Sequence, residues 1–249
     1  MPASSPYRMA KVIEQIAECV KDSDELEWPG LRKDRRPTKR EGQRFFLGSC
    51  IDYMQNADVA WAKVDDLLIN IVPHRYRDDV FSWICRRHTK AEWARKHHKY
   101  NLHRFPSAHT RLYGIAKSIV NEYDGDPRNV WERTPARKLL DVLTHDVKVG
   151  SAIGHMMVGA LRDNGLISKR RSDFKPDRHV CRLMKAIGLS QSDNPKDVIA
   201  AGRRWFKDPW AVDKAFYVMG REGVKNRLDV ERYYRRAVLG KVKAIRVGS

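Results

Sequence analysis

The stretch VKVGSAIGHMMVGALRDNGLISKRRSDFKPDRHVCRLMKAIGL, residues 147–189, is the most informative part of the chain for its fold. Apolar residues recur in it at helical spacing in two blocks, and a glycine-containing turn precedes the first block. The order of predicted elements is a helix ending near His145, a tight turn containing Gly150, a helix from Ser151 to Asp163, a basic loop, and a helix that begins at Asp177.

The glycine turn itself suggests a chemical role. A turn of this kind between two helices presents the free backbone amides of the second helix toward solvent, where a phosphate of a DNA strand can bind. We therefore expect Lys148, Gly150 and Ser151 to contact the DNA backbone rather than the bases.

The charge of the whole chain favours the same kind of partner. Its 249 residues include 49 Lys and Arg against 31 Asp and Glu, a net charge of +18. A field of this sign attracts polyanions, so nucleic acid is the expected partner. The excess is concentrated in four separate segments, which suggests a folded surface lining a groove rather than a basic tail; these are residues 32–44, 86–104, 162–182 and 225–246. The alternative is a surface charged only for solubility.

Other classes of protein fit the composition poorly. No apolar run approaches the roughly 20 residues of a membrane helix, and the N-terminal residues lack the apolar core of a secretory signal. The four cysteines form no CxxC pair, which argues against a disulfide scaffold or an iron–sulfur cluster. We expect a cytoplasmic protein, nucleoid-associated if prokaryotic, with reduced thiols.

Helical periodicity extends over nearly the whole chain, which predicts an all-α fold. We expect two lobes with a cleft between them. The central lobe is predicted at residues 45–145, and the second lobe combines residues 1–44 with residues 146–249, including the hairpin and Asp177.

Two motifs resemble those of the helix-hairpin-helix base-excision DNA glycosylases. VKVGSAIG, residues 147–154, is similar to the family's hairpin LPGVGRKTA, and PDRHVCRL, residues 176–183, is similar to its later motif VDTHVFRV. Residues 49–64 resemble the family's first core helix, and residues 107–132 resemble the helix pair before the hairpin. The resemblance covers residues 45–188.

The resemblance implies a role for individual residues. Asp177 falls on the catalytic aspartate, while His179 and Arg182 fall where the family holds phosphate. Gln55 or Asn56 falls where a polar wedge fills the gap left by a flipped base. The lysine of bifunctional members falls on Ala152, which cannot be a nucleophile.

The implied activity is that of a monofunctional DNA glycosylase. Such an enzyme flips a modified or mismatched base, hydrolyses its N-glycosidic bond and leaves an abasic site. The target base stays open among alkylated, deaminated, oxidised and phage-type modified bases. We expect double-stranded DNA as substrate, a monomeric enzyme and no cofactor.

Several further hypotheses remain open at this stage. A flipped base needs a stacking wall, for which Trp61, His155 and Trp210 are candidates. The long basic loop 164–176 could reach DNA or cover the pocket. The segment containing Cys85, His88, His97, His98 and His103 is either a zinc site or, as we favour, a basic DNA-facing loop. The competing functions are a non-catalytic binder of damaged or unusual DNA and a structured-RNA binder.

Overall fold

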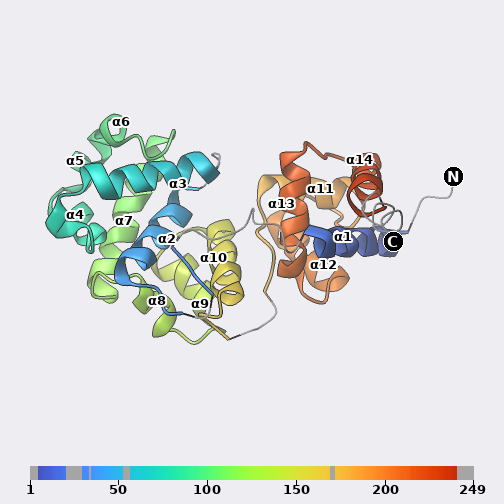
Figure 1. Cartoon of the computed structure of the whole chain (residues 1–249), viewed down its shortest axis with the longest axis horizontal. Coiled ribbons are helices and arrows are strands. Elements are labelled where there is room, and N and C mark those ends of the chain that lie inside the picture. Colours follow the sequence, from blue (N-terminus) through green and yellow to red (C-terminus); the bar gives the residue numbers. More distant parts are fainter. Residues whose placement is uncertain (1–4, 21–29, 34, 53–56, 169–171, 240–249) are drawn as a thin grey trace, which may run out of the picture. The chain divides into compact units, whose positions relative to one another are not determined.

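The computed structural model describes residues 5–20, 30–33, 35–52, 57–168 and 172–239. These residues form helices and connecting turns with no β-strand among them, which confirms the all-α fold. No helix in the described part is long and apolar enough to cross a membrane. The chain divides into two compact units (Figure 1): unit 1 comprises residues 1–26 and 171–249, and unit 2 comprises residues 27–170.

Unit 1 is built around α1 (Pro6–Val20), which packs against α13 (Asp213–Arg221) and the segments beside it. Helix α1 buries one apolar face, with Ile13 and Ile16 fully enclosed. Each such side chain stabilises the fold by about 1.5–3 kcal/mol. The other elements are α11 (Arg178–Ala186), α12 (Pro195–Trp205), η5 (Pro209–Val212), α14 (Arg227–Tyr234) and η6 (Arg235–Leu239).

Unit 2 is organised around the 17-residue helix α7 (Pro106–Glu122). It packs against α2 (Lys39–Ile51), α4 (Val80–Arg86) and α5 (Lys90–Arg95). The remaining elements are α3 (Ala57–Asp66), η2 (Leu67–Ile71), η3 (His74–Tyr76), α6 (His97–Tyr100), α8 (Arg128–Glu132), α9 (Leu139–Asp141), η4 (Val142–Asp146) and α10 (Ser151–Asp163). Of residues 49–64, which resemble the family's first core helix, residues 49–51 end α2 and residues 57–64 belong to α3.

The hairpin belongs to unit 2, whereas the sequence placed it in the lobe of Asp177. Helix α10 packs against α9, η4 and α2, so residues 146–170 join the central helices. The N-terminal helix α1 groups with α11–α14, as the sequence suggested.

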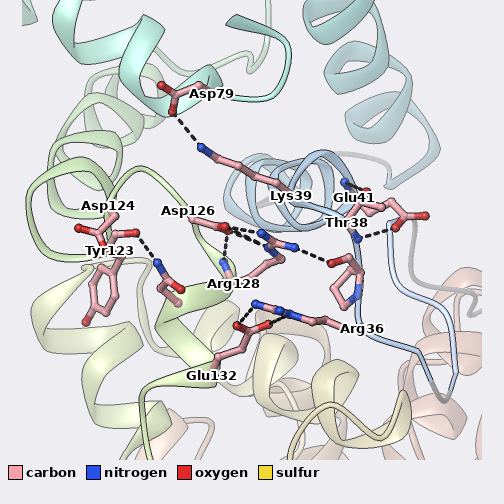
Figure 2. A network of polar contacts seen from close by, with 12 residues as sticks. Arg36, Thr38, Lys39, Glu41, Asp79, Tyr123, Asp124, Asp126, Arg128 and Glu132 are labelled. Carbon is pink, nitrogen blue, oxygen red and sulfur yellow. Dashed lines mark hydrogen bonds and ion pairs between the residues drawn. The ribbon is translucent and has the colours of Figure 1, made fainter.

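Residues 30–44 also belong to unit 2, where polar contacts hold them on the loop around α8 (Figure 2). The guanidinium of Arg128 binds both carboxylate oxygens of Asp126 and donates to Pro37 O at 3.0 Å. Arg36 forms a two-point ion pair with Glu132, with distances of 2.7 and 2.6 Å. Such planar, paired contacts fix the orientation of both partners.

Helix α2 begins where it does because Thr38 and Glu41 form a capping box. The Thr38 hydroxyl accepts from Glu41 N, and the Glu41 carboxylate accepts from Thr38 N at 2.8 Å. The same Glu41 carboxylate pairs with Arg35. The basic segment that the sequence placed in the second lobe is thus docked onto unit 2 by its own side chains.

Candidate nucleic-acid interface

The predicted hairpin is formed in unit 2 by η4, residues 147–150 and α10. Val147 and Val149 are fully buried, and Val149 N donates to Leu143 O at 3.0 Å. Between them the exposed Lys148 adopts a left-handed conformation, with φ of 65°. A glycine occupies this position in the family motif, and a non-glycine residue in this region costs about 1–2 kcal/mol. The turn therefore has the geometry that its sequence suggested, although only one of the motif's glycines is present.

The N-terminus of α10 lies open beyond this turn. Its N-cap is Gly150, with φ of 92°, and no side chain caps the helix. Ser151 is exposed. A Cβ atom at Gly150 would meet only Arg111 Nη1 of α7, at 3.9 Å. Uncapped amides beside a guanidinium suit an anion such as a phosphate group.

Asp177 is the N-cap of α11 in unit 1. Its Oδ1 accepts hydrogen bonds from His179 N and Val180 N, both at 2.9 Å. In the described part of the chain Oδ2 accepts no hydrogen bond, and no lysine or arginine pairs with this partly exposed carboxylate. The cap thus fixes the side chain and leaves one oxygen available.

The two phosphate-binding candidates beside Asp177, His179 and Arg182, differ in their exposure to solvent. Arg182 is exposed on α11. His179 packs against α13, where its ring atoms lie 2.8–3.3 Å from the position that a Cβ at Gly220 would take. Burial lowers the pKa of His179, so the ring is neutral at pH 7. Its placement is that of a packing group inside unit 1 rather than of an exposed phosphate ligand.

The candidates for the base pocket do not come together in one unit. Trp61 and His155 lie in unit 2, and Trp210 lies in unit 1. The Trp61 ring fills the space above Gly48 of α2, where a Cβ would come within 1.9 Å of it. His155 and Trp210 are both 6% exposed. Gln55 and Asn56 lie outside the described residues.

The basic loop 164–176 is described at its two ends. Asn164 and Gly165 close α10, with the Asn164 amide donating to Ala160 O at 2.8 Å. At the other end Phe174 is fully buried, and Asp173 forms a two-point ion pair with Arg203. Residues 172–176 are therefore packed onto unit 1. The cationic residues 169–171 lie outside the described part.

The residues considered for zinc form another kind of cluster. No group of three or more His, Cys, Asp or Glu in the described part could hold a metal ion. Instead His97 Nε2 lies 2.6 Å from His103 O, and His88 Nδ1 lies 3.2 Å from Ile84 O. The centre of this cluster is Trp93, which is fully buried.

Stacking and hydrogen bonding complete the Trp93 cluster, which sequence reasoning missed. The Trp93 ring stacks on His109 with centroids 4.3 Å apart and 7° between the planes, and its Nε1 donates to His109 O at 2.9 Å. Trp83 and Tyr100 pack at its edges, with centroids 5.8 and 5.4 Å away. The sequence signal for this cluster was the recurrence of histidines and tryptophans at helical spacing.

The cysteines offer no reactive thiol at the positions that the structure buries. Burial raises the pKa of Cys50 to about 12 and that of Cys181 to about 11. None of the four cysteines, all of which lie in the described ranges, forms a disulfide.

A pocket of about 260 Å³ lies between α2 and the α3–η2 segment in unit 2. Its walls include Arg40, Glu41, Asp65 and Ile69. Arg44 and Asp65 form a two-point ion pair within this wall. None of the predicted base-pocket residues lines it.

Comparison with protein families, with characterised proteins and with solved structures finds no match to this chain.

Proposed function

We propose that the protein is a monofunctional DNA glycosylase that removes a modified or mismatched base from duplex DNA. The observation that carries the proposal is the hairpin, in which Lys148 takes the left-handed conformation of the motif's glycine and leaves the N-terminus of α10 open to a phosphate. The +18 net charge supports the same partner.

Asp177 is the residue to which we assign the chemistry. Cleavage of an N-glycosidic bond builds positive charge on the deoxyribose, and a fixed carboxylate beneath the sugar stabilises that charge and orients the attacking water. Asp177 meets the requirement for rigidity, because two backbone hydrogen bonds hold Oδ1 while Oδ2 is left for substrate. Ala152 at the lyase position limits the reaction to hydrolysis, with an abasic site as product.

A second candidate is a non-catalytic protein that binds damaged or unusual DNA through its hairpin. Two observations favour it: Oδ1 of Asp177 caps helix α11, and His179 packs against Gly220. Both are expected where an aspartate serves only to start a helix.

One experiment separates the two functions. Duplexes that each carry one alkylated, deaminated, oxidised or hypermodified base are incubated with the protein and then with hot alkali, which cuts at abasic sites. We expect cleavage of at least one duplex, and a fall of about 10²–10³-fold in rate for Asp177→Asn, since the amide keeps the cap but loses the charge.

The matched control is Asn194→Ala, which removes the cap of α12 in the same unit. The Asn194 side chain accepts from Lys196 N at 2.9 Å, so its loss should cost about 1 kcal/mol of stability without affecting the rate. If every duplex survives alkali, or if Asp177→Asn cuts as fast as the parent protein, the enzymatic proposal is wrong.

A further inference from the structure

Residues 86–104 of unit 2 carry a dense and unneutralised positive charge. They contain seven Lys and Arg but only one acid, Glu92. The Glu92 carboxylate is occupied by its capping box, accepting from Thr89 N at 2.6 Å. Among the described residues none of the seven cations forms an ion pair, and six are exposed: Arg86, Arg87, Lys90, Arg95, Lys99 and Arg104. We call these six residues the basic module.

The segment at residues 32–44 shows that a high density of Lys and Arg in the sequence does not by itself leave those cations without ion pairs. It has seven Lys and Arg in 13 residues and is thus denser than residues 86–104, yet Arg36 pairs with Glu132, Lys39 with Asp79 and Arg44 with Asp65. A paired cation has little charge left for a partner, whereas the cations of the basic module offer theirs in full.

The basic module is held on a rigid frame. Helices α5 and α6 have six and four residues, too few to be stable alone. The Trp93 cluster holds them against α7, and the Tyr113 hydroxyl of α7 donates to His88 O at 3.2 Å. The backbone that carries the cations is thus ordered before any ligand binds, which reduces the entropic cost of binding.

Helix α7 lies between this frame and the hairpin and contacts both. His109 faces the Trp93 cluster, and Arg111, two residues later on the same helix, reaches Gly150 at the start of α10. Ser118 further along α7 donates to Asp146 O in η4 at 3.3 Å. Because successive residues of an α-helix are about 100° apart, His109 and Arg111 point to opposite sides of α7, and the frame of the module and the hairpin pack on opposite sides of this one helix.

We propose that the basic module binds the phosphate backbone of duplex DNA without reading its bases, as a second contact surface of unit 2 besides the N-terminus of α10. This inference takes from the proposed function only that the partner is duplex DNA. Exposed cations without acids between them suit phosphates spaced along a strand, and such contacts position a protein on DNA without specifying sequence.

The test compares two triple variants that lose the same charge. Arg86→Gln, Lys90→Gln, Lys99→Gln alters the module, and Lys196→Gln, Lys207→Gln, Lys225→Gln removes three exposed lysines of unit 1. Binding of an unmodified 20-base-pair duplex DNA and of a duplex RNA of equal length is followed by fluorescence anisotropy from low to high salt.

We expect the module variant to bind DNA at least about tenfold more weakly at low salt. Its slope of log affinity against log salt should fall by up to about 2.7, or about 0.9 per lost contact. The unit 1 variant should keep nearly the slope of the parent protein. Equal losses in the two variants, no loss in the module variant, or a loss confined to duplex RNA would each overturn the inference.

The two proposals fail separately. Asp177→Asn should keep the binding slope of the parent protein while losing base release, whereas the module variant should lose binding slope. If no duplex is processed but the module variant still loses slope, the glycosylase proposal fails and this inference stands. If Asp177→Asn is inactive but the module variant binds like the parent protein, the inference fails and the glycosylase proposal stands.

Discussion

Acidification should destabilise unit 2 through His109. This side chain is 1% exposed and stacks on Trp93, and neither of its ring nitrogens has a hydrogen bond in the described part of the chain. Burial, reinforced by the nearby His97, lowers the pKa of His109 from 6.5 to about 4. The folded protein therefore holds the ring neutral, whereas the unfolded chain takes up a proton below pH 6.5.

The sign and size follow from proton linkage. Because the pKa is lower in the folded state, the contribution is complete above pH 6.5 and is lost as the pH falls toward 4. Between pH 7 and pH 5 the loss from this one group is about 2 kcal/mol. Burial also lowers the pKa of His88, which adds to the loss in the same direction.

The assay is urea unfolding of the full chain at pH 7 and pH 5, for the parent protein and for His109→Phe. Phenylalanine keeps the stack on Trp93 but cannot titrate, and it removes two buried nitrogens that lack partners. We expect His109→Phe to be about as stable as the parent at pH 7, and to lose about 2 kcal/mol less than the parent on going to pH 5. An identical pH dependence in both proteins would refute the reasoning.

Three further substitutions test the packing and the turn. Gly48→Ala should destabilise unit 2 by more than about 2 kcal/mol in urea unfolding, because the added Cβ would lie 1.9 Å from the Trp61 ring; a smaller change would mean that the ring moves easily. Lys148→Gly should keep or raise stability by up to about 1 kcal/mol, since φ is 65°, while weakening DNA binding; unchanged binding would show that the lysine charge is not used. Arg128→Met should cost about 2–3 kcal/mol, because Asp126 is left largely buried without its partner, and should speed hydrogen exchange at residues 35–41; unchanged exchange would mean that other contacts hold this segment.

Local signals predicted the helices of this protein well. The predicted start of α11 at Asp177 is confirmed, with the side chain accepting from first-turn amides. Helix α12 begins in the same way after Asn194, whose side chain accepts from Lys196 N.

Long-range pairing was beyond the reach of sequence reasoning. The residues of the ion pair between Arg36 and Glu132 are 96 positions apart, so nothing local shows that this arginine is neutralised. The same holds for α10, whose apolar face could pack on either unit and in fact packs on α2, α9 and η4. The histidines of residues 88–103 suggested metal ligands by type, but ring nitrogens of His88 and His97 lie against backbone carbonyls, and His103 Nδ1 accepts from Phe105 N.

The proposed function places DNA binding and chemistry in different units. The open turn at Lys148 and the unpaired cations of the basic module lie in unit 2, where α7 connects them. Asp177 lies in unit 1, fixed by the helix that it caps. A carboxylate used for catalysis gains nothing from surrounding lysines, because a neighbouring cation would offset the negative charge that it offers to the sugar. A phosphate-binding surface needs the reverse, many cations without acids. Under the proposed function, variants of unit 2 therefore test DNA binding and variants of unit 1 test base release, so the two properties can be measured independently.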